Sequence, residues 1–129
     1  MIYLITGKAG AGKTHYATKL IEELQIDKEK VIMIDGDEYR EKTSNHDYSL
    51  AGRTKNLMGA ATLAKDFEEE GYIVVMAFVA PNKELRNMMR THWQASRTIY
   101  IPGGDLWEGT TYEIPDEDEL DLYDKNNIL

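Results

Sequence analysis

The stretch "GKAGAGKT", residues Gly7–Thr14, limits the possible folds of this chain more than any other part of its sequence. It matches the pattern G-x-x-x-x-G-K-[ST], and it follows an apolar run and precedes a segment with helical spacing. The glycines let the backbone fold around phosphate groups, which its N–H groups and the positive end of the helix attract. The pattern therefore predicts a nucleotide-binding loop. A glycine-rich strand-to-helix turn without a ligand is the alternative.

Within such a loop, Lys13 would neutralise charge on the β- and γ-phosphates, and the Thr14 hydroxyl would ligate Mg²⁺. ATP and Mg²⁺ are therefore the expected cofactors. The residues expected to bind the nucleotide are Gly7, Ala9, Gly10, Ala11, Gly12, Lys13, Thr14 and His15. The base-reading motif Asn-Lys-x-Asp of GTPases is approached most nearly by "NKEL" at residues 82–85. Leucine replaces the aspartate there, so a GTPase is disfavoured.

The rest of the chain alternates between short apolar runs and segments with helical spacing. Buried strands are expected at residues 1–6, 31–34, 72–79 and 98–101, and helices at residues 13–24, 53–70 and 83–93. The last of these helices is expected to point four side chains inward: Leu85, Met88, Met89 and Trp93. Because the strands show no polar alternation and helices separate them, they predict a parallel sheet covered on both faces. The predicted fold class is three-layer α/β, a P-loop NTPase/kinase fold with a parallel sheet flanked by helices.

Two aspartates around one glycine, in "IDGDEYR" at residues 34–40, follow the second predicted strand. The carboxyl ends of parallel strands open onto one crevice, so Asp35 and Asp37 are expected near the phosphate loop. One carboxylate could orient or deprotonate an acceptor hydroxyl, or hold Mg²⁺ through water. The predicted catalytic residues are thus Lys13, Asp35 and Asp37, and the predicted metal-binding residues are Thr14 and Asp35. The alternative is that Asp37 only caps the helix that follows.

Three ordered blocks of sequence support a more specific interpretation. "DGDEYR" is followed by "YSLAGRTKN" from Tyr48 and by "AFVAPNKELR" from Ala77. Together with the phosphate loop, these blocks resemble D-G-D-N-x-R, F-S-x-x-D-R-x-x-N and S-F-I-S-P-Y-R-x-x-R of the adenylylsulfate kinases (APS kinases). The resemblance covers residues 1 to about 101. Glu38, Gly52 and Ala77 stand where the family has asparagine, aspartate and serine.

That family transfers the γ-phosphate of ATP to the 3′-hydroxyl of adenylyl sulfate, and the resemblance implies the same kind of reaction here. It implies that Asp35 is the catalytic base or organises Mg²⁺, and that Tyr48 and Phe78 flank the adenine of the acceptor. The implied acceptor-binding residues are Asp37, Arg40, Tyr48, Arg53, Asn56, Phe78 and Val79. Two of these residues have a simpler structural alternative. Phe78 could be a core residue at the end of a strand, and Arg53 could be an ordinary residue at the start of a helix.

The lid of that family, which is rich in lysine and arginine, has no evident counterpart here. The corresponding stretch, Pro102–Pro115, reads "PGGDLWEGTTYEIP" and contains no Lys or Arg. The overlapping "YEIPDEDELDL" resembles the family's closing segment, in which an acidic strand follows Y-E-x-P. Trp107 could cover a base in place of the lid or pack over the core. Arg86 and Arg90, four residues apart, could form a solvated helix face.

The length of 129 residues fits one domain, predicted as a P-loop kinase domain at residues 1–112 with an acidic C-terminal segment at residues 113–129. The net charge is −8, and the acidic segment holds seven acids against one lysine, so it is interpreted as a solvated tail. This acidity argues against a long nucleic acid as partner. With no cysteine, no signal peptide and no membrane-spanning apolar stretch, a cytoplasmic protein without a membrane partner is expected. So short a kinase could pair as a homodimer.

The sequence thus predicts an ATP-dependent small-molecule kinase with a nucleotide-like acceptor, by resemblance the 3′-hydroxyl of adenylyl sulfate. One alternative keeps the fold and changes the acceptor to another nucleoside, a nucleotide or a polynucleotide 5′ end. Another is a non-catalytic ATP-binding module. The missing lid motivates this last reading, because lid closure excludes water and lid cations offset phosphoryl charge.

Overall fold

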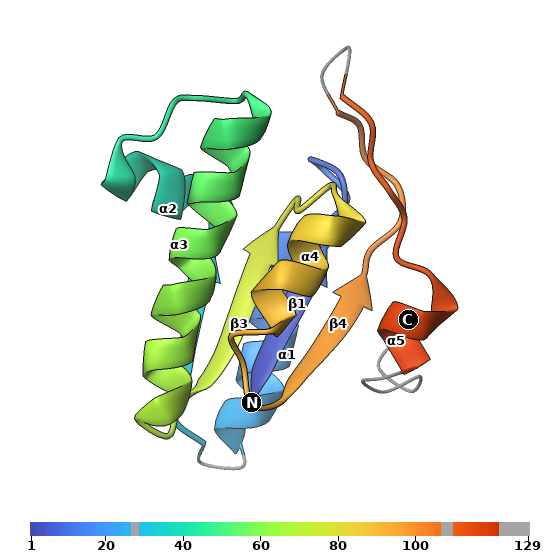
Figure 1. The fold of residues 1–129 in the computed structure, drawn as a ribbon. Coiled ribbons are helices and arrows are strands. Elements are labelled where there is room, and N and C mark those ends of the chain that lie inside the picture. Colours follow the sequence, from blue (N-terminus) through green and yellow to red (C-terminus); the bar gives the residue numbers. More distant parts are fainter. Residues whose placement is uncertain (27–28, 107–109, 122–129) are drawn as a thin grey trace.

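The computed structural model of the chain describes residues 1–26, 29–106 and 110–121. Along these ranges the elements are β1 (Ile2–Thr6), α1 (Lys13–Ile26), β2 (Val31–Asp35), α2 (Gly36–Thr43), α3 (Leu50–Glu69), β3 (Ile73–Phe78), α4 (Lys83–Arg90), β4 (Ser96–Tyr100) and α5 (Glu117–Asp121). Figure 1 shows the sheet between α1 on one face and α3 with α4 on the other. The expected three-layer α/β arrangement is confirmed.

In the described residues, the strands form one parallel sheet in the order β2-β3-β1-β4. The two central strands, β1 and β3, pair Ile2 with Val74 and Thr6 with Phe78. Both of them are buried over nearly their whole length. This explains their continuous apolar sequences, since helices cover a parallel sheet on both faces. All four strands point the same way, so their carboxyl ends share one edge of the sheet.

Each face of the sheet carries its own core. On one face, α1 contributes Ala17 and packs Leu20 and Leu24 against Ile5 and Val75. On the other face, the buried stripe of α3 contributes Leu57, Ala60, Ala61 and Ala64 to a cluster with Leu4, Val74 and Met76. The small side chains of the three alanines let α3 approach the sheet closely. The inward residues of both helices recur at the three- and four-residue spacing of an amphipathic helix.

Several local expectations were wrong or shifted, and α3 begins at Leu50, three residues before the expected helix start. Helix α4 ends at Arg90, and Met88 is 41% exposed rather than inward, because the buried stripe of this helix runs through Leu85 and Met89. Strand β4 begins at Ser96, two residues before the first predicted strand residue. Residues Glu117–Asp121 form the helix α5 where an acidic strand was expected.

The helix α5 has a local cause. The Asp116 carboxylate accepts a hydrogen bond from the Glu119 backbone N–H at 3.1 Å, which is the arrangement of an N-terminal cap. The Glu119 side chain is only 2% exposed, because it turns inward to meet arginines of α4. Glu119 therefore departs from the expected solvated tail, whereas the other described acids of the segment are exposed: Glu113, Asp116, Glu117 and Asp118. No helix among the described residues is long and apolar enough to cross a bilayer.

Candidate active site

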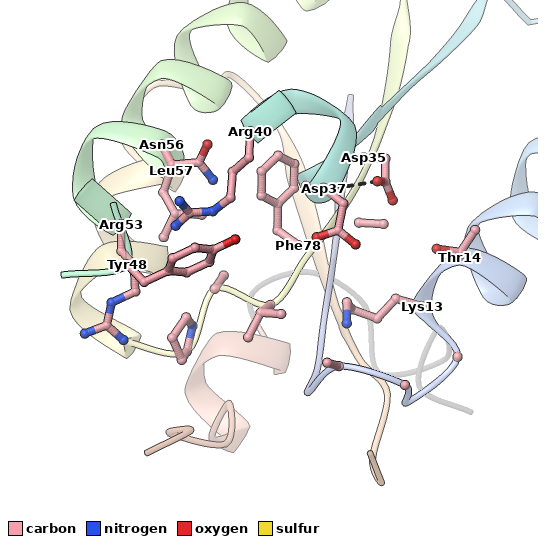
Figure 2. Close-up of a pocket in the computed structure, with 18 of the residues that line it drawn as sticks. Lys13, Thr14, Asp35, Asp37, Arg40, Tyr48, Arg53, Asn56, Leu57 and Phe78 are labelled. Carbon is pink, nitrogen blue, oxygen red and sulfur yellow. Dashed lines mark hydrogen bonds between the residues drawn. The ribbon is translucent and has the colours of Figure 1, made fainter. Parts of the chain in front are cut away.

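The carboxyl edge of the sheet carries a pocket of about 390 Å³ (Figure 2). The phosphate loop follows β1, Asp35 ends β2, and the segment 77–81 leaves β3, so one edge brings together residues far apart in the sequence. The lining residues are Ala9, Gly10, Gly12, Lys13, Thr14, His15, Asp35, Gly36, Asp37, Arg40, Tyr48, Arg53, Asn56, Leu57, Ala77, Phe78, Val79, Ala80 and Pro81. Every predicted site residue except Gly7 and Ala11 belongs to this lining.

The glycines of the phosphate loop serve two different purposes. Gly10 and Gly12 have φ values of 77° and 103°, a region that side chains disfavour, so the fold of the loop requires glycine there. Gly7 answers a different need, because a Cβ at this position would lie 2.5 Å from the Ile101 carbonyl oxygen. It lets the chain that leaves β4 pass close to the loop.

Lys13 lies at the centre of the charged groups. Its Nζ donates a hydrogen bond to the Lys8 carbonyl oxygen at 2.8 Å, within the phosphate loop. Burial lowers the pKa of Lys13, while the charges of Asp37 and Asp35 act in the opposite direction. Figure 2 shows these side chains reaching into the same part of the pocket. The two aspartates are therefore close enough to act electrostatically on the lysine that would meet the phosphates.

Asp35 has a structural role as well as a position in the pocket. It is the N-cap of α2, and its Oδ2 accepts hydrogen bonds from the N–H groups of Asp37 at 3.1 Å and Glu38 at 3.2 Å. The interpretation of Asp37 as the cap is thus wrong, since it lies in the first turn of the helix. The cap leaves the Asp37 carboxylate to the pocket, beside Lys13.

The far end of the pocket holds two buried polar atoms that lack a partner. Arg53 Nε and Asn56 Oδ1 make no hydrogen bond with any of the described residues. Both residues stand in the first two turns of α3 and line the pocket, on the side away from Lys13 (Figure 2). An unsatisfied buried donor or acceptor costs about 1–3 kcal/mol, so such atoms indicate a place where a polar ligand or water binds. Arg53 offers a donor there and Asn56 an acceptor.

Arg40 shapes the loop between α2 and α3. Its Nη1 donates to the carbonyl oxygens of Asn45 and Asp47, each at 3.2 Å. Its guanidinium lies 4.3 Å from the ring centre of Tyr48, which is 53% exposed at the pocket. Phe78 is almost fully buried, packs near Tyr39 in the core and also lines the pocket. The two aromatic side chains thus differ, because the Tyr48 ring is exposed to solvent and the Phe78 ring is a buried part of the pocket lining.

The same loop explains why residue 52 is a glycine. A Cβ there would lie 2.5 Å from Asp47 Cγ, so the loop can fold over α3 only where no side chain stands. Asn45 secures this contact through a 2.9 Å hydrogen bond from Nδ2 to the Gly52 carbonyl oxygen. Ser49 caps α3 and accepts from the Gly52 N–H at 3.3 Å. Hydrogen bonds from Ser49 lower the pKa of the Asp47 carboxyl.

The segment after β4 contacts the phosphate loop. The Asp105 N–H donates to the Ala9 carbonyl oxygen at 2.9 Å, and a Cβ on Gly104 would lie 2.8 Å from the Ala11 nitrogen. The described parts of this stretch, residues 101–106 and 110–116, contain no helix. Trp107, considered above as a cover for a base, lies outside the described residues.

The arginines of α4 are not a solvated face. Arg86 is fully buried, and its Nε and Nη2 donate to the Glu119 carboxylate at 2.9 and 3.2 Å. Arg90 Nη2 donates to the same carboxylate at 2.9 Å. Burial works to raise the pKa of Glu119, but the hydrogen bonds and charges of both arginines outweigh it and lower the pKa. The i, i+4 spacing was correct for one helix face, and that face turned out to be internal.

Sequence reasoning missed several lining residues. Gly36, Leu57, Ala77, Ala80 and Pro81 line the pocket as neighbours of predicted site residues. Their positions next to the strand ends and to Asn56 were a signal that could have included them. Nothing in the sequence indicates the backbone of Ala80, whose φ of 42° is unusual for a residue with a side chain.

The fold and the phosphate loop define a P-loop protein of the nucleotide-binding kinase class. The chain belongs to the adenylylsulphate kinase family, whose sequence profile matches residues 1–125. It is 30% identical to a cytidine diphosphoramidate kinase of Campylobacter jejuni over 96% of this chain and 69% of that protein. It is 35% identical to a probable adenylyl-sulfate kinase of Aeropyrum pernix over 70% of this chain and 50% of that protein.

Solved structures agree on the fold. The APS kinase of Mycobacterium tuberculosis in complex with AMPPNP and APS superposes with a TM-score of 0.73 at 21% identity, covering 78% of this chain and 61% of that one. A hexameric APS kinase of Thiobacillus denitrificans gives 0.70 at 26% identity, covering 77% and 21%. The relatives named here are kinases, phosphotransferases with a hydroxyl acceptor. The chain spans about half the length of the adenylyl-sulfate kinases that it matches.

Proposed function

We propose that this chain is an ATP-dependent kinase that transfers the γ-phosphate to a hydroxyl of a small nucleotide-like acceptor, in the first place the 3′-hydroxyl of adenylyl sulfate. The observation that carries the proposal is the shared pocket. One end is the phosphate loop with Lys13, and the other end presents Arg53 Nε and Asn56 Oδ1, to which no described residue hydrogen-bonds. A phosphate-binding loop and a second polar subsite lie along one crevice.

The residues divide the reaction between them. The loop N–H groups and Lys13 would bind the β- and γ-phosphates, and the nearby carboxylates would receive the acceptor hydroxyl. As the acceptor oxygen forms its bond to the γ-phosphorus, the bond to the departing ADP breaks, and Asp35 or Asp37 takes the hydroxyl proton. Arg53 would donate to an anionic group of the acceptor and Asn56 would accept from a hydroxyl or amino group.

Thr14 and Asp35 are the residues that would hold Mg²⁺. Both line the pocket on the phosphate-loop side, and a hydroxyl and a carboxylate are oxygen ligands of the kind that this ion prefers. The ion supplies charge neutralisation to the phosphates. The carboxylate of Asp35 has Oδ2 engaged by the helix cap, and no described residue donates a hydrogen bond to its Oδ1.

A second acceptor class follows from one observation. The relative matched over the greatest share of this chain among those cited is named a cytidine diphosphoramidate kinase. Tyr48 presents an exposed ring rather than base-specific hydrogen-bond groups, and a ring face accepts any base. A cytidine diphosphate derivative is therefore the second candidate acceptor.

The test is ADP release from Mg²⁺–ATP with adenylyl sulfate, cytidine diphosphate derivatives and a panel of nucleosides and nucleotides. Asp35→Asn is expected to lower turnover about 10²-fold or more while ATP binding stays, because asparagine still caps α2 but carries no charge. The matched control is Glu38→Gln, an exposed acid in the same helical turn, which should leave turnover unchanged. Tight ATP binding without release of ADP on any acceptor would contradict the proposal and favour a non-catalytic ATP-binding module.

The homodimer expected from the small size of the chain is part of the same proposal, and light scattering of the purified protein tests it. The solved hexameric APS kinase shows that one relative assembles further.

A further inference from the structure

One wall of the pocket is held by hydrogen bonds to three successive backbone carbonyl oxygens. The Val79 carbonyl oxygen accepts from the Thr6 hydroxyl at 2.6 Å, and the Ala80 carbonyl oxygen accepts from Arg86 Nη1 at 2.7 Å. The Pro81 carbonyl oxygen accepts from the Glu113 N–H at 2.8 Å. Residues 79–81 all line the pocket, so these bonds set the position of its wall from behind.

This wall has a conformation that needs support. Ala80 has a φ of 42°, in the left-handed region that residues with a Cβ disfavour. It is also buried, so its backbone cannot turn to water for hydrogen bonds. A strained, buried wall keeps its shape only where the surroundings fix it, and here the surroundings are Thr6, Arg86 and Glu113.

The C-terminal segment supplies most of this support. Arg86 Nη2 donates to the Glu113 carbonyl oxygen at 2.7 Å, and the Glu119 carboxylate engages Arg86 through Nε and Nη2. The Tyr112 hydroxyl lies 2.7 Å from the Thr6 hydroxyl, whose single hydrogen is donated to Val79. Segment 112–119 therefore reaches all three of the wall's supports, and Glu119 provides the buried countercharge that orients the guanidinium of Arg86.

We propose that Glu119 is a positioning residue for the acceptor side of the pocket, acting through Arg86 on the Val79–Pro81 wall. Glu119 does not line the pocket and touches no reacting group. The inference rests on the proposed kinase function and deepens it. It gives the acidic C-terminal segment a role in acceptor binding, whereas ATP binding depends on the phosphate loop itself.

Glu119→Gln tests the proposal, because it keeps the shape of the side chain and removes the charge that orients Arg86. The KM for the acceptor is expected to rise about tenfold, with the KM for ATP unchanged within about twofold. The matched control is Glu68→Gln, since Glu68 is also a buried carboxylate. Glu68 accepts from the Gln94 N–H at 2.9 Å and pairs with the terminal amino group of Met1 at 2.9 Å, at the opposite end of α3 from Arg53.

Both variants are expected to lower Tm, and only Glu119→Gln is expected to change the KM for the acceptor. Equal Tm losses with the acceptor KM unchanged in both would overturn the proposal, because Glu119 would then act on stability alone. Arg86→Lys is the second variant. It retains a positive charge without the fork that spans Glu119, Ala80 and Glu113, and it should reproduce the acceptor effect.

Hydrogen exchange separates this proposal from the proposed function. In Glu119→Gln, amide exchange of a peptide covering residues 78–82 should rise severalfold, while a peptide covering residues 7–14 and the Glu68→Gln protein show no such rise. If no acceptor supports turnover in the unsubstituted protein, the kinase function fails and this readout alone decides the link between Glu119 and the wall. Unchanged exchange at residues 78–82 would then overturn it.

Discussion

Two pairs of arginines in this chain look alike in the sequence and have opposite surroundings in the structure. Arg40 and Arg53 border the pocket, where Arg53 Nε has no partner among the described residues. Arg86 is buried and Arg90 half-buried beside the Glu119 carboxylate, and both donate to it. Arg40 and Arg53 present positive charge to a ligand that enters the pocket. The charges of Arg86 and Arg90 are instead compensated by the carboxylate of Glu119.

The difference teaches that the neighbours of an arginine decide its role. A guanidinium with a buried carboxylate beside it is a structural group, because removing either partner would leave an uncompensated charge. A guanidinium at a pocket with an unpaired donor is available to an anion. The following predictions test this contrast, from the largest expected effect to the smallest.

Arg86→Ala should strongly destabilise the protein. It leaves Glu119 buried without its main partner and removes the hydrogen bond to the Ala80 carbonyl oxygen, so the expected loss is about 3–5 kcal/mol of unfolding free energy. Urea unfolding measures this loss. Lys65→Ala is the control, since Lys65 forms an exposed i, i+4 pair with Glu69 and its loss should cost less than about 0.5 kcal/mol. Similar effects from both substitutions would break the contrast.

Arg53→Ala should leave stability nearly unchanged and weaken acceptor binding. The lost charge-assisted hydrogen bond corresponds to about 1.5–3 kcal/mol, or roughly a 10- to 100-fold higher Kd for the acceptor by calorimetry. Lys55→Ala removes a positive charge from an exposed position of the same helix and should do neither. If Arg53→Ala instead lowered Tm as Arg86→Ala does, both arginines would be structural.

Ala80→Gly tests the strain in the wall. Relief of the left-handed conformation should stabilise the fold by about 1–2 kcal/mol, and the extra freedom of glycine in the unfolded chain should offset about 0.5–1 of this. A net gain of about 0.5–1 kcal/mol in thermal unfolding is expected. A loss of stability would mean that the Ala80 side chain contributes packing that outweighs the strain.

The smallest expected effect is on the stability of the fold at low pH. The pKa of Glu119 in the folded protein is lowered from an ordinary value of 4.5, so its contribution to stability is complete above about pH 4.5 and is lost as the pH falls through the lower folded pKa. Glu119→Gln should therefore lose less stability than the unsubstituted protein below pH 4.5. Unfolding curves between pH 7 and pH 3 measure this, and parallel pH profiles of the two proteins would show that the carboxylate is not coupled to the fold.

The sequence predicted those parts of the molecule that local signals carry. The phosphate loop has a pattern that its backbone requires, and the apolar runs of β1 and β3 reflect burial on both faces of the sheet. Asp35 and Asp37 could be placed because parallel strands share one edge. The family resemblance added Arg53 and Asn56, and the structure places both at the pocket.

The parts that could not be predicted depend on contacts between distant residues. Arg86 and Glu119 are 33 positions apart, and neither spacing nor composition links them, so each looked like a surface residue. The φ of Ala80 follows from the carbonyl contacts of its neighbours rather than from alanine itself. Gly7 matched its motif, yet its tight spacing to the Ile101 carbonyl oxygen became visible only when the strands were paired.

The link between Glu119 and the pocket wall also sets an order of events during synthesis. The phosphate loop and β2 leave the ribosome early, but β1 pairs with β3 some 70 residues later, so the sheet cannot close until β3 is made. The Val79–Pro81 wall cannot be fixed before Glu119 is synthesised, 33 residues after Arg86. At about 5–20 residues per second, a few seconds separate the synthesis of Arg86 from that of Glu119, so a nascent chain could bind ATP before the Val79–Pro81 wall is fixed. Nucleotide could therefore act as a ligand of the nascent chain before the chain is a complete enzyme.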